Sequence, residues 1–385
     1  MDMKQILRFV LAALPLVAAA CSSGWQRQVE ESPLVEIRPE AELAMYVDEA
    51  SDELVLELPP VDIPAHGVDG GHGHAGHVTD ALIGRIPESG WLRGFRTELV
   101  DANGDTVPSV LLHHMNLMTP DRRELFSPIM QRVAAAGNET APVALPRMLG
   151  YPMAAGERLL LKAMVHNPTN VDYTGVRVRV RIPFTRGDAV LAPMHVFPFY
   201  LDVMPPAGVH AYDMPPGRSE QSWEGAPAVE ARILALGGHL HKYAEVLRLE
   251  DVTAGKVLWE TTPHLDEAGN VIGMPQDYLF RRWGIKLHPS HTYRLTAVYN
   301  NPTGETIPEG AMGAAGGIVL VNRKAAWPGV DPADPQYALD VSTQVDGADD
   351  GMMNVNHEPV AGAATSHGGH GSHSEPAPAA SGHNH

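Results

Sequence analysis

A short stretch of strictly alternating residues places the strongest constraint on the fold of this chain. Residues 176–182 read VRVRVRI, a period of two that predicts a β-strand with one buried face and one positively charged face. The 385 residues also include 33 prolines and 37 glycines, which favour many short strands joined by turns over long helices. We therefore expect an all-β protein, and its length allows two domains with sizeable cores.

Further apolar segments extend this pattern. Residues 95–100 and 109–114 flank the turn-like sequence DANGD at 101–105, so we expect them to form a hairpin. Residues 158–166 form another apolar strand, whereas the Ser-Pro pair at 127–128 is typical of the start of a short helix. The first half of the chain is thus predicted to be mainly strands with one short helical connection.

A segment rich in proline and glycine, residues 205–217, marks a predicted domain boundary. Strand-like segments separated by turns follow it, a pattern typical of antiparallel β-sandwiches and jelly rolls. We expect an N-terminal β-sandwich at 45–205 and a C-terminal β-sandwich at 206–340. Residues 341–385 lose all periodicity and predict a disordered, His-rich C-terminal tail.

The N-terminus predicts export and lipid anchoring. Two basic residues precede an apolar run at 9–20 that is too short to cross a bilayer and is typical of a secretory signal peptide, residues 1–20. Cys21 follows Val-Ala-Ala-Ala directly, which resembles the bacterial lipoprotein signal in which this cysteine is lipidated. We expect residues 21–44 to be the lipidated cysteine and its tether, which hold the exported protein on a membrane of the bacterial cell envelope.

Charge and cysteine content restrict the partners and the sources of stability. The formal net charge is −18 and no Lys/Arg cluster occurs, which argues against nucleic acid or an anionic membrane surface as a partner. Cys21 is the only cysteine, so no intrachain disulfide can form. Stability must come from the hydrophobic core and from bound metal.

A His-x-His pair is the first candidate for a metal site. His239 and His241 lie in a stretch that predicts a strand, and side chains two apart on a strand share a face. Gly237 and Gly238 are expected to leave room beside them. The alternative is that both histidines are surface residues on an edge strand.

Four more residues complete two candidate metal sites. His113 and His114 are adjacent, so both can bind one ion only at a strand end or at a bulge, where the backbone twists. His166 ends an apolar strand, where a lone histidine is usually a hydrogen-bonded structural residue. Met312 lies among small residues in EGAMGAAGG, so we expect a ligand in an open, Gly-lined pocket rather than a core methionine.

These donor sets suit copper. Three neutral imidazoles serve both Cu(I) and Cu(II), whereas two imidazoles and a thioether favour Cu(I), the oxidation state that reacts with dioxygen. Zinc could occupy either set, although a thioether would be an unusual ligand for it. Two electronically different copper sites are therefore predicted.

The order and local context of these residues resemble the copper type II, ascorbate-dependent monooxygenases, the family of peptidylglycine α-hydroxylating monooxygenase and dopamine β-monooxygenase. The resemblance extends from Trp91 to Val321. It is carried by the segments LLHHMNLM, LKAMVHNPTN, GGHLHK and YNNPTGETIPEGAMG. The spacing of these segments suits two domains of similar size.

The resemblance implies two β-sandwich (jelly-roll) domains that face each other across a solvent-filled cleft, with one copper ion on each. The electron-storing copper would be held by His113, His114 and His166. The catalytic copper would be held by His239, His241 and Met312. By the same resemblance, the protein would hydroxylate a C–H bond of a small organic substrate with dioxygen, using ascorbate or a similar small reductant as electron donor.

Departures from the family pattern restrict the substrate. The peptide-amidating members carry an arginine just before the His-x-His pair to hold the substrate carboxylate, and this chain has Gly237 there. They also carry polar groups soon after the methionine, where this chain has Gly313, Ala314 and Ala315. Glycine-extended peptides are therefore not the expected substrates, and the disulfides of the animal enzymes are absent.

Two other interpretations stay open. A copper chaperone or buffer, anchored in the same way, would bind the ion without catalysis and could collect it through the tail and a Gly-rich loop with His66, His72, His74 and His77. A lipoprotein sandwich that uses its histidines only structurally would hold no copper tightly.

Overall fold

The computed structural model describes residues 42–65, 77–137, 140, 142–208, 210–279, 283–322 and 327–345. The predicted signal peptide, the lipidated Cys21, most of the tether and the tail beyond 345 lie outside these residues, as do His66, His72 and His74. None of the helices in the described ranges has the length and apolar character needed to span a bilayer.

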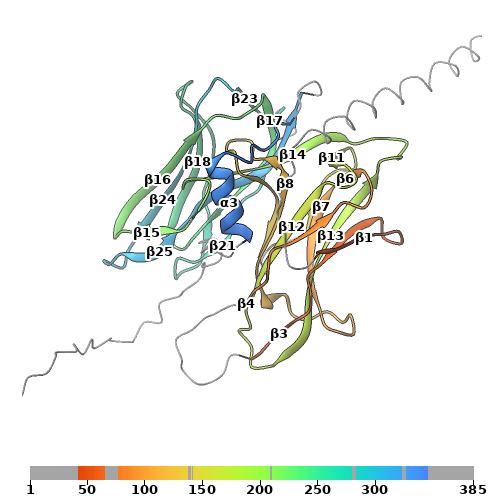
Figure 1. The fold of residues 1–385 in the computed structure, drawn as a ribbon. Helices are drawn as coiled ribbons and strands as arrows, with labels where there is room; N and C mark the ends of the chain where they lie inside the picture. The colour runs from red at the N-terminus through yellow and green to blue at the C-terminus, as the bar shows by residue number, and fades with distance from the viewer. Residues whose placement is uncertain are drawn as a thin grey trace, which may run out of the picture. The chain divides into compact units, whose positions relative to one another are not determined.

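Strands dominate the described chain, as the sequence predicts (Figure 1). Those of the first half are β1 (Ala44–Asp48), β2 (Glu53–Glu57), β3 (Val61–Ile63), β4 (His77–Val78), β5 (Leu82–Arg85), β6 (Gly90–Leu92), β7 (Gly94–Val100), β8 (Leu112–Arg123), β9 (Met130–Ala136), β10 (Val143–Ala144), β11 (Leu149–Met153), β12 (Arg158–Val165), β13 (Tyr173–Arg186) and β14 (Met194–Asp202). Those of the second half are β15 (Tyr212–Met214), β16 (Gly217–Gly225), β17 (Ala231–Leu240), β18 (Ala244–Asp251), β19 (Lys256–Thr261), β20 (His264–Leu265), β21 (Val271–Gly273), β22 (Asp277–Tyr278), β23 (Ile285–Leu287), β24 (Tyr293–Asn301), β25 (Ile307–Ala311) and β26 (Gly313–Val321). The described part also contains one α-helix, α3 (Pro335–Val345), and one 3-10 turn at Ser109–Leu111.

One large sheet runs through both halves of the chain. Its strand order is β1-β2-β13-β6-β11-β14-β26-β17-β22, with β3, β7, β10 and β23 attached at its sides. β14 of the first half pairs antiparallel with β26 of the second half, from Val196 opposite Leu320 to Asp202 opposite Ala314. The two predicted sandwiches therefore share this sheet.

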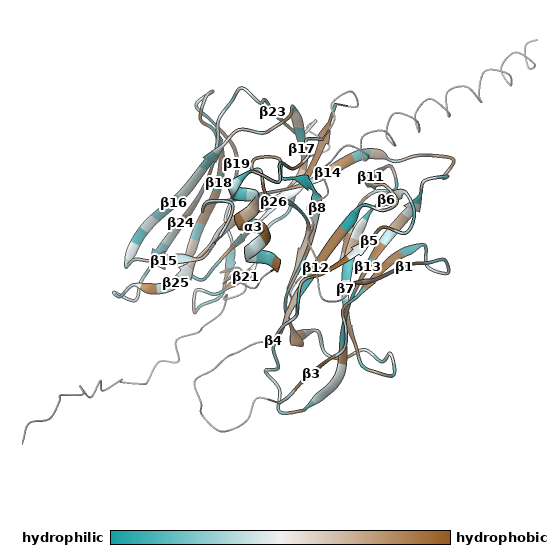
Figure 2. Ribbon diagram, in the orientation of Figure 1, coloured by the Kyte–Doolittle hydropathy of each residue, from teal (hydrophilic) through white to brown (hydrophobic). Residues whose placement is uncertain are grey.

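Two smaller antiparallel sheets of four or more strands accompany the large sheet, in addition to the two-stranded pairs β15 with β25 and β20 with β21. The first contains β4, β12, β8 and β9, with β5 also paired to β12, and the second has the order β16-β24-β18-β19. The second sheet packs closely on β26, because a Cβ at Gly313 would lie only 2.6 Å from the Cβ of Ala297 on β24. Hydrophobic and hydrophilic residues are interspersed along the strands (Figure 2), so that apolar side chains fill the space between sheets. The all-β antiparallel fold expected from the sequence is confirmed.

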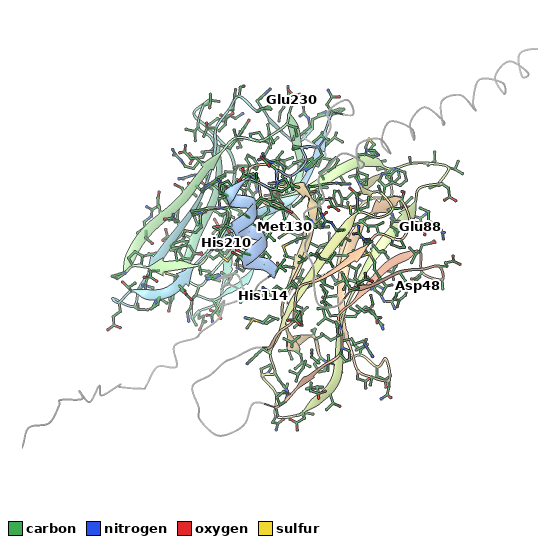
Figure 3. All side chains as sticks on the ribbon, viewed as in Figure 1. Asp48, Glu88, His114, Met130, His210 and Glu230 are labelled. Atoms are coloured by element: carbon green, nitrogen blue, oxygen red, sulfur yellow. The ribbon has the colours of Figure 1, made fainter. Side chains whose placement is uncertain are left out.

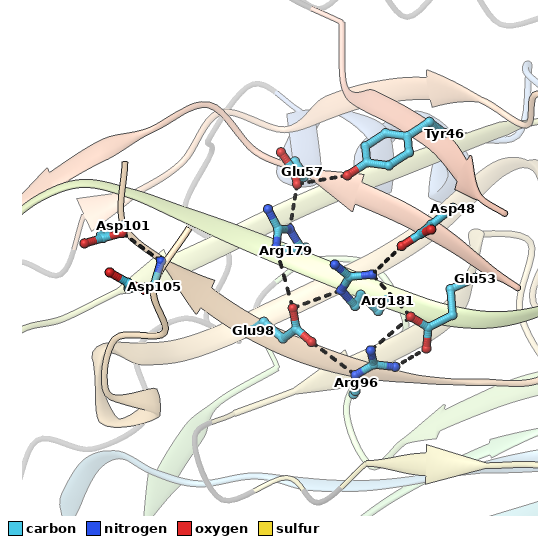
Figure 4. A network of polar contacts seen from close by, with 10 residues as sticks. All are labelled: Tyr46, Asp48, Glu53, Glu57, Arg96, Glu98, Asp101, Asp105, Arg179 and Arg181. Carbon is cyan, nitrogen blue, oxygen red and sulfur yellow. Dashed lines mark hydrogen bonds and ion pairs between the residues drawn. The ribbon is translucent and has the colours of Figure 1, made fainter. Parts of the chain in front are cut away.

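The alternating segment behaves as predicted, and its charged face is neutralised. On β13 the four apolar residues of the alternation are buried, whereas the arginines between them are half-buried on the opposite face. Arg179 donates to Glu57 at 2.6 Å, and Arg181 donates to Glu98 at 3.0 Å (Figure 4). Neighbouring strands thus supply carboxylates for Arg179 and Arg181, which form an ion-pair network on this face.

The predicted hairpin at 95–100 and 109–114 is wrong. β7 pairs with β13 and β10 in the large sheet, whereas β8 pairs with β12 and β9 in another sheet. The turn at Ser109–Leu111 carries the chain from one layer to the other. Two apolar segments joined by a turn sequence can cross between layers as well as pair, and long-range pairing decides the outcome.

The short helix predicted after Ser127 is also wrong. Residues Met130–Ala136 form β9, which pairs antiparallel with β8. The Ser-Pro signal is local, whereas the edge of β8 offers backbone partners along several residues. Pairing with β8 therefore overrides the local helix signal.

Helix α3 extends five residues into the tail that was expected to be disordered from residue 341. It packs beside β8 and β9 (blue in Figure 1). The hydroxyl of Tyr337 donates to the carbonyl of Pro120 at 3.0 Å. Asp340 accepts hydrogen bonds from the Arg132 guanidinium at 2.5 and 2.8 Å, and both side chains are buried. These buried contacts explain why the chain stays helical to Val345.

We expect Asp340→Asn to lower the free energy of unfolding by about 3 kcal/mol, because it leaves the buried Arg132 guanidinium without its counter-charge. Urea unfolding followed by fluorescence measures this change. Asp331→Asn is the matched control, since Asp331 is exposed and an asparagine can keep its bond to the N–H of Ala333. Equal stability of the two variants would show that the buried pair contributes nothing.

Candidate metal centre

β8 carries a bulge at its adjacent histidines. Met164 of β12 pairs with His114, but Val165 pairs with Leu112, so His113 is the extra residue. The ring centroids of His113 and His114 lie 4.3 Å apart with an angle of 45° between the ring planes. On a flat strand these neighbours would point to opposite faces. The structure thus has a bulge here, one of the two arrangements, strand end or bulge, that would let these adjacent histidines share an ion.

His166 lies beside this bulge. It directly follows β12, and its N–H donates to the carbonyl of Leu111 at 2.9 Å, just before β8 begins. The structure thus brings the backbone at His166 next to the segment that carries His113 and His114. Within the described ranges, however, no three His, Cys, Asp or Glu side chains are arranged as a metal-binding group. A shared ion for these three histidines stays a prediction.

His239 and His241 lie where β17 ends. β17 stops at Leu240, so His239 is its penultimate residue and His241 is the first residue beyond it. Their ring centroids are 5.2 Å apart and the ring planes are nearly perpendicular, at 88°. The structure therefore brings this predicted pair together at a strand end.

The two glycines before this pair have different roles. A Cβ at Gly238 would lie 2.4 Å from Cδ2 of Leu247 and 3.0 Å from Cε of Met274, so glycine is needed there for close packing. The expectation that Gly238 leaves room beside the histidines is wrong, since those apolar side chains fill the space. At Gly237 a Cβ would meet only the Cγ of Gln276, at 3.4 Å, and the carbonyl of Pro275, at 3.8 Å. Position 237 is therefore the roomier of the two.

Met312 occupies the gap between β25 and β26. Its side chain is only 3% exposed, so the open pocket expected there is wrong. The small residues that follow it serve close packing of the sheets instead, as the contact of Gly313 with Ala297 shows. Burial alone is compatible with both a core methionine and a thioether ligand, and its role as a ligand stays a prediction.

Tyr299, on β24, joins the two segments that carry His241 and Met312. Its hydroxyl accepts the N–H of His241 at 2.9 Å and the N–H of Met312 at 3.2 Å, and it donates to the carbonyl of Met312. The tyrosine is fully buried. The sequence analysis missed this residue, because one tyrosine in an apolar strand has no distinguishing local signal.

Histidines from β8 and β17 influence one another electrostatically. Burial lowers the pKa of His114 to about 3, with smaller contributions from His113 and His239. Burial also lowers the pKa of His241 to about 3, with contributions from His239 and His114 that a backbone hydrogen bond at Gly310 opposes. The two predicted sites thus lie within electrostatic range of each other. Both imidazoles are neutral at physiological pH, and neutral imidazole is the form that binds metal.

Two buried ring nitrogens fit a metal ion. The Nε2 atoms of His114 and His241 are buried and have no hydrogen-bond partner among the residues that the structure describes. Leaving such an atom unsatisfied costs about 1–3 kcal/mol. The lone pair of a neutral imidazole nitrogen is also a common ligand for copper and zinc. One such atom thus lies in each of the two predicted copper sites, where a metal ion would use its lone pair.

A buried polar cluster lies on the same sheet face as His239. Ala314 of β26 is opposite both Asp202 on β14 and His239 on β17, and side chains of directly opposed residues share a face. Asp202 accepts the hydroxyl of Tyr200, and its carboxylate lies 3.1 Å from Nδ1 of the fully buried His210 (labelled in Figure 3). No sequence pattern indicated this cluster, because His210 lies in the proline-rich segment taken as a domain boundary.

Comparisons with known proteins add little to this geometry. No protein-family model matches the chain, and no curated protein matches it. Similar solved structures include the major capsid protein P2 of bacteriophage PM2, with a TM-score of 0.33 and 10% identity over 69% of this chain and 99% of that chain. Another is PNGase F, a glycosylasparaginase from Flavobacterium meningosepticum, with a TM-score of 0.32 and 12% identity over 70% of this chain and 96% of that chain. Similarities of this extent carry no argument about function.

The lowered pKa values predict a loss of stability in mild acid for the metal-free protein. In the unfolded chain these imidazoles take up a proton near pH 6.5, whereas His114 and His241 do so only near pH 3 in the folded chain. The unfolded state therefore binds more protons between these values, and stability falls as the pH drops from about 6.5 to about 3. Each group contributes a slope of at most about 1.4 kcal/mol per pH unit.

Replacing either histidine with glutamine should flatten this dependence. The measurement is the free energy of unfolding in urea, with a chelator present, between about pH 7 and about pH 4. His264→Gln is the control, because His264 is exposed on β20 and should leave the slope unchanged. If His114→Gln and His241→Gln retain the parent slope, these buried imidazoles do not titrate as described.

Proposed function

We propose that the protein is an exported, membrane-anchored copper monooxygenase that hydroxylates a C–H bond of a small organic substrate, with dioxygen and a small reductant such as ascorbate. The observation that carries the proposal is the geometry of two histidine pairs from distant segments, His113 and His114 at the bulge of β8 and His239 and His241 at the end of β17. Their mutual electrostatic influence supports two copper sites near each other. The resemblance in the segments around these histidines supplies the reaction class.

The donor set favours copper over other metals. His239, His241 and Met312 would offer two imidazoles and a thioether, a set that suits Cu(I), whereas imidazoles alone suit both copper oxidation states. When bound, copper would supply the one-electron redox chemistry and the reaction with dioxygen that amino-acid side chains lack. One oxygen atom would enter the substrate, and the other would leave as water with two electrons from the reductant and two protons.

The protein's own residues would hold the ligands and keep them neutral. Burial keeps the pKa of His114 and His241 low, so both imidazoles stay unprotonated and able to bind metal in mild acid. The bulge at His113 turns two adjacent rings toward each other. Tyr299 fixes the backbone beside His241 and Met312. Each of these features positions a predicted ligand before metal binds.

The surroundings of Gly237 favour a substrate without a carboxylate at this point. In the peptide-amidating members of the family that this chain resembles, an arginine at the matching position holds the substrate carboxylate. Here the neutral Gln276 lies beside Gly237, and it accepts the hydroxyl of the exposed Tyr278 at 3.0 Å. We therefore include neutral small molecules and exclude glycine-extended peptides from the proposed substrates.

Dioxygen uptake with ascorbate tests the proposed activity. We expect copper-loaded protein to consume dioxygen faster than the same concentration of free copper, and a double variant, His239→Ala with His241→Ala, to lose this excess. A form that ends at Val345 keeps α3 and lacks the His-rich tail. The difference in dioxygen consumption between this form and the full-length protein gives the part that is due to copper bound by the tail. Tight copper binding without any excess uptake, across a panel of small substrates, would favour the chaperone or buffer interpretation.

Met312→Ile tests the thioether ligand. Isoleucine is similar in bulk to methionine but lacks sulfur, and thioethers bind Cu(I) better than Cu(II). We expect X-ray absorption of the Cu(I) form to show a copper–sulfur contribution in the parent and none in the variant. The Cu(II) content should stay near that of the parent, because His239 and His241 are retained, while turnover falls. A parent spectrum without sulfur would make Met312 a packing residue and would contradict the proposed site.

A further inference from the structure

Tyr299 crosses the core between two sheets. It lies on β24, where it is opposite Ser219 of β16 and Ala244 of β18. Its hydroxyl reaches the facing sheet, at the points where β17 ends and where β25 gives way to β26. A single side chain therefore connects one sheet to two points of the facing layer at which a strand ends.

The backbone groups of His241 and Met312, at these two strand ends, need hydrogen-bond partners from outside the sheet. Met312 belongs to neither β25 nor β26, and His241 lies just beyond β17, so neither backbone is part of a strand ladder. Buried backbone N–H and C=O groups must be paired, or they cost free energy. The Tyr299 hydroxyl pairs the N–H of His241 together with the N–H and the carbonyl of Met312.

These three bonds use the full capacity of the hydroxyl. A tyrosine O–H donates once and accepts through its lone pairs, and here it donates to one carbonyl and accepts two N–H groups. No bonding capacity is left for a substrate or a metal. Tyr299 is fully buried as well, so its role is to hold other residues in place.

We infer that Tyr299 is a positioning residue for the copper site, one that fixes His241 and Met312 relative to each other in the metal-free protein. The inference rests on the proposed function, which makes these two residues ligands of one ion. Two ligands from segments 71 positions apart in the chain must be held within a fraction of an ångström to bind one metal well. A shared hydroxyl does this without touching the ion.

Tyr299→Phe removes the hydroxyl and keeps the ring. The comparison uses full-length protein loaded with Cu(I) and measures the copper–sulfur contribution in X-ray absorption together with the Cu(I) affinity of the sulfur-bearing site. We expect the sulfur contribution to weaken or disappear and the affinity to fall about 10- to 100-fold, as is usual when residues that orient metal ligands are removed.

Tyr293→Phe is the matched control. Tyr293 lies on the same strand and is fully buried, and its hydroxyl accepts the N–H of His288 at 2.8 Å. It is six residues from Tyr299, or about 20 Å along the strand. This variant should also lose stability, though less than Tyr299→Phe because only one N–H loses its partner, while keeping the copper–sulfur signal and the Cu(I) affinity of the parent. A purely structural tyrosine would give the same copper properties in both variants.

The possible results separate the inference from the proposed function. If the parent shows copper–sulfur binding and Tyr299→Phe matches Tyr293→Phe, the positioning role is wrong while the proposed site stands. If the parent shows no copper–sulfur binding, both are wrong.

A measurement on the metal-free parent covers the case in which Tyr299→Phe does not fold. Hydrogen exchange at the amides of His241 and Met312 should be as slow as in the strands beside them. Exchange at the rate of exposed loops would overturn the inference, because the hydroxyl would then hold neither segment before metal binds.

Discussion

The backbone pairing of β14, β26 and β17 is the constraint on which the rest of the structure depends. β26 pairs with β14 on one side and with β17 on the other, and this links the two halves of the chain. The same register places Asp202, Ala314 and His239 in one row on one face. A shift of one residue in the register of any of these strands would turn its member of the row to the other face of the sheet. The pairing register of these strands therefore decides on which face of the sheet the candidate site lies.

The candidate site uses the places where regular pairing fails. His113 is the extra residue of a bulge, His241 follows the end of β17, and Met312 lies between β25 and β26. Regular strands send adjacent side chains to opposite faces, so adjacent ligands such as His113 and His114 can converge only where the pattern breaks. Such breaks leave backbone groups without ladder partners, and at His241 and Met312 the Tyr299 hydroxyl supplies them. The strand ends at His241 and Met312 therefore depend on the buried Tyr299 for their hydrogen bonds.

Buried ion pairs fix how the layers and the last helix meet. Arg122 donates to both carboxylate oxygens of Glu157, at 2.6 and 2.7 Å, and its guanidinium lies 4.9 Å from the ring centroid of Tyr151. Arg132 and Asp340 join β9 to α3 in the same way. Desolvation makes such pairs poor net sources of stability, but a buried charge without its partner is strongly unfavourable. They therefore select one arrangement of the strands and of α3 over its alternatives.

Features that depend on neighbours along the chain could be predicted from the amino-acid sequence. The period of two at residues 176–182 predicted a strand and its buried face, because alternation is a local property of an extended backbone. The His-x-His spacing predicted two histidines close together on a strand, and a shared site for the adjacent His113 and His114 called for a strand end or a bulge, of which the structure contains the bulge. Only the tertiary structure decided that residues 95–100 and 109–114 lie in different sheets, that residues 130–136 form a strand, that Met312 is buried and that Tyr299 joins it to His241. These outcomes depend on pairing and packing between residues far apart in the chain, and no local pattern records which distant segment will supply the partner.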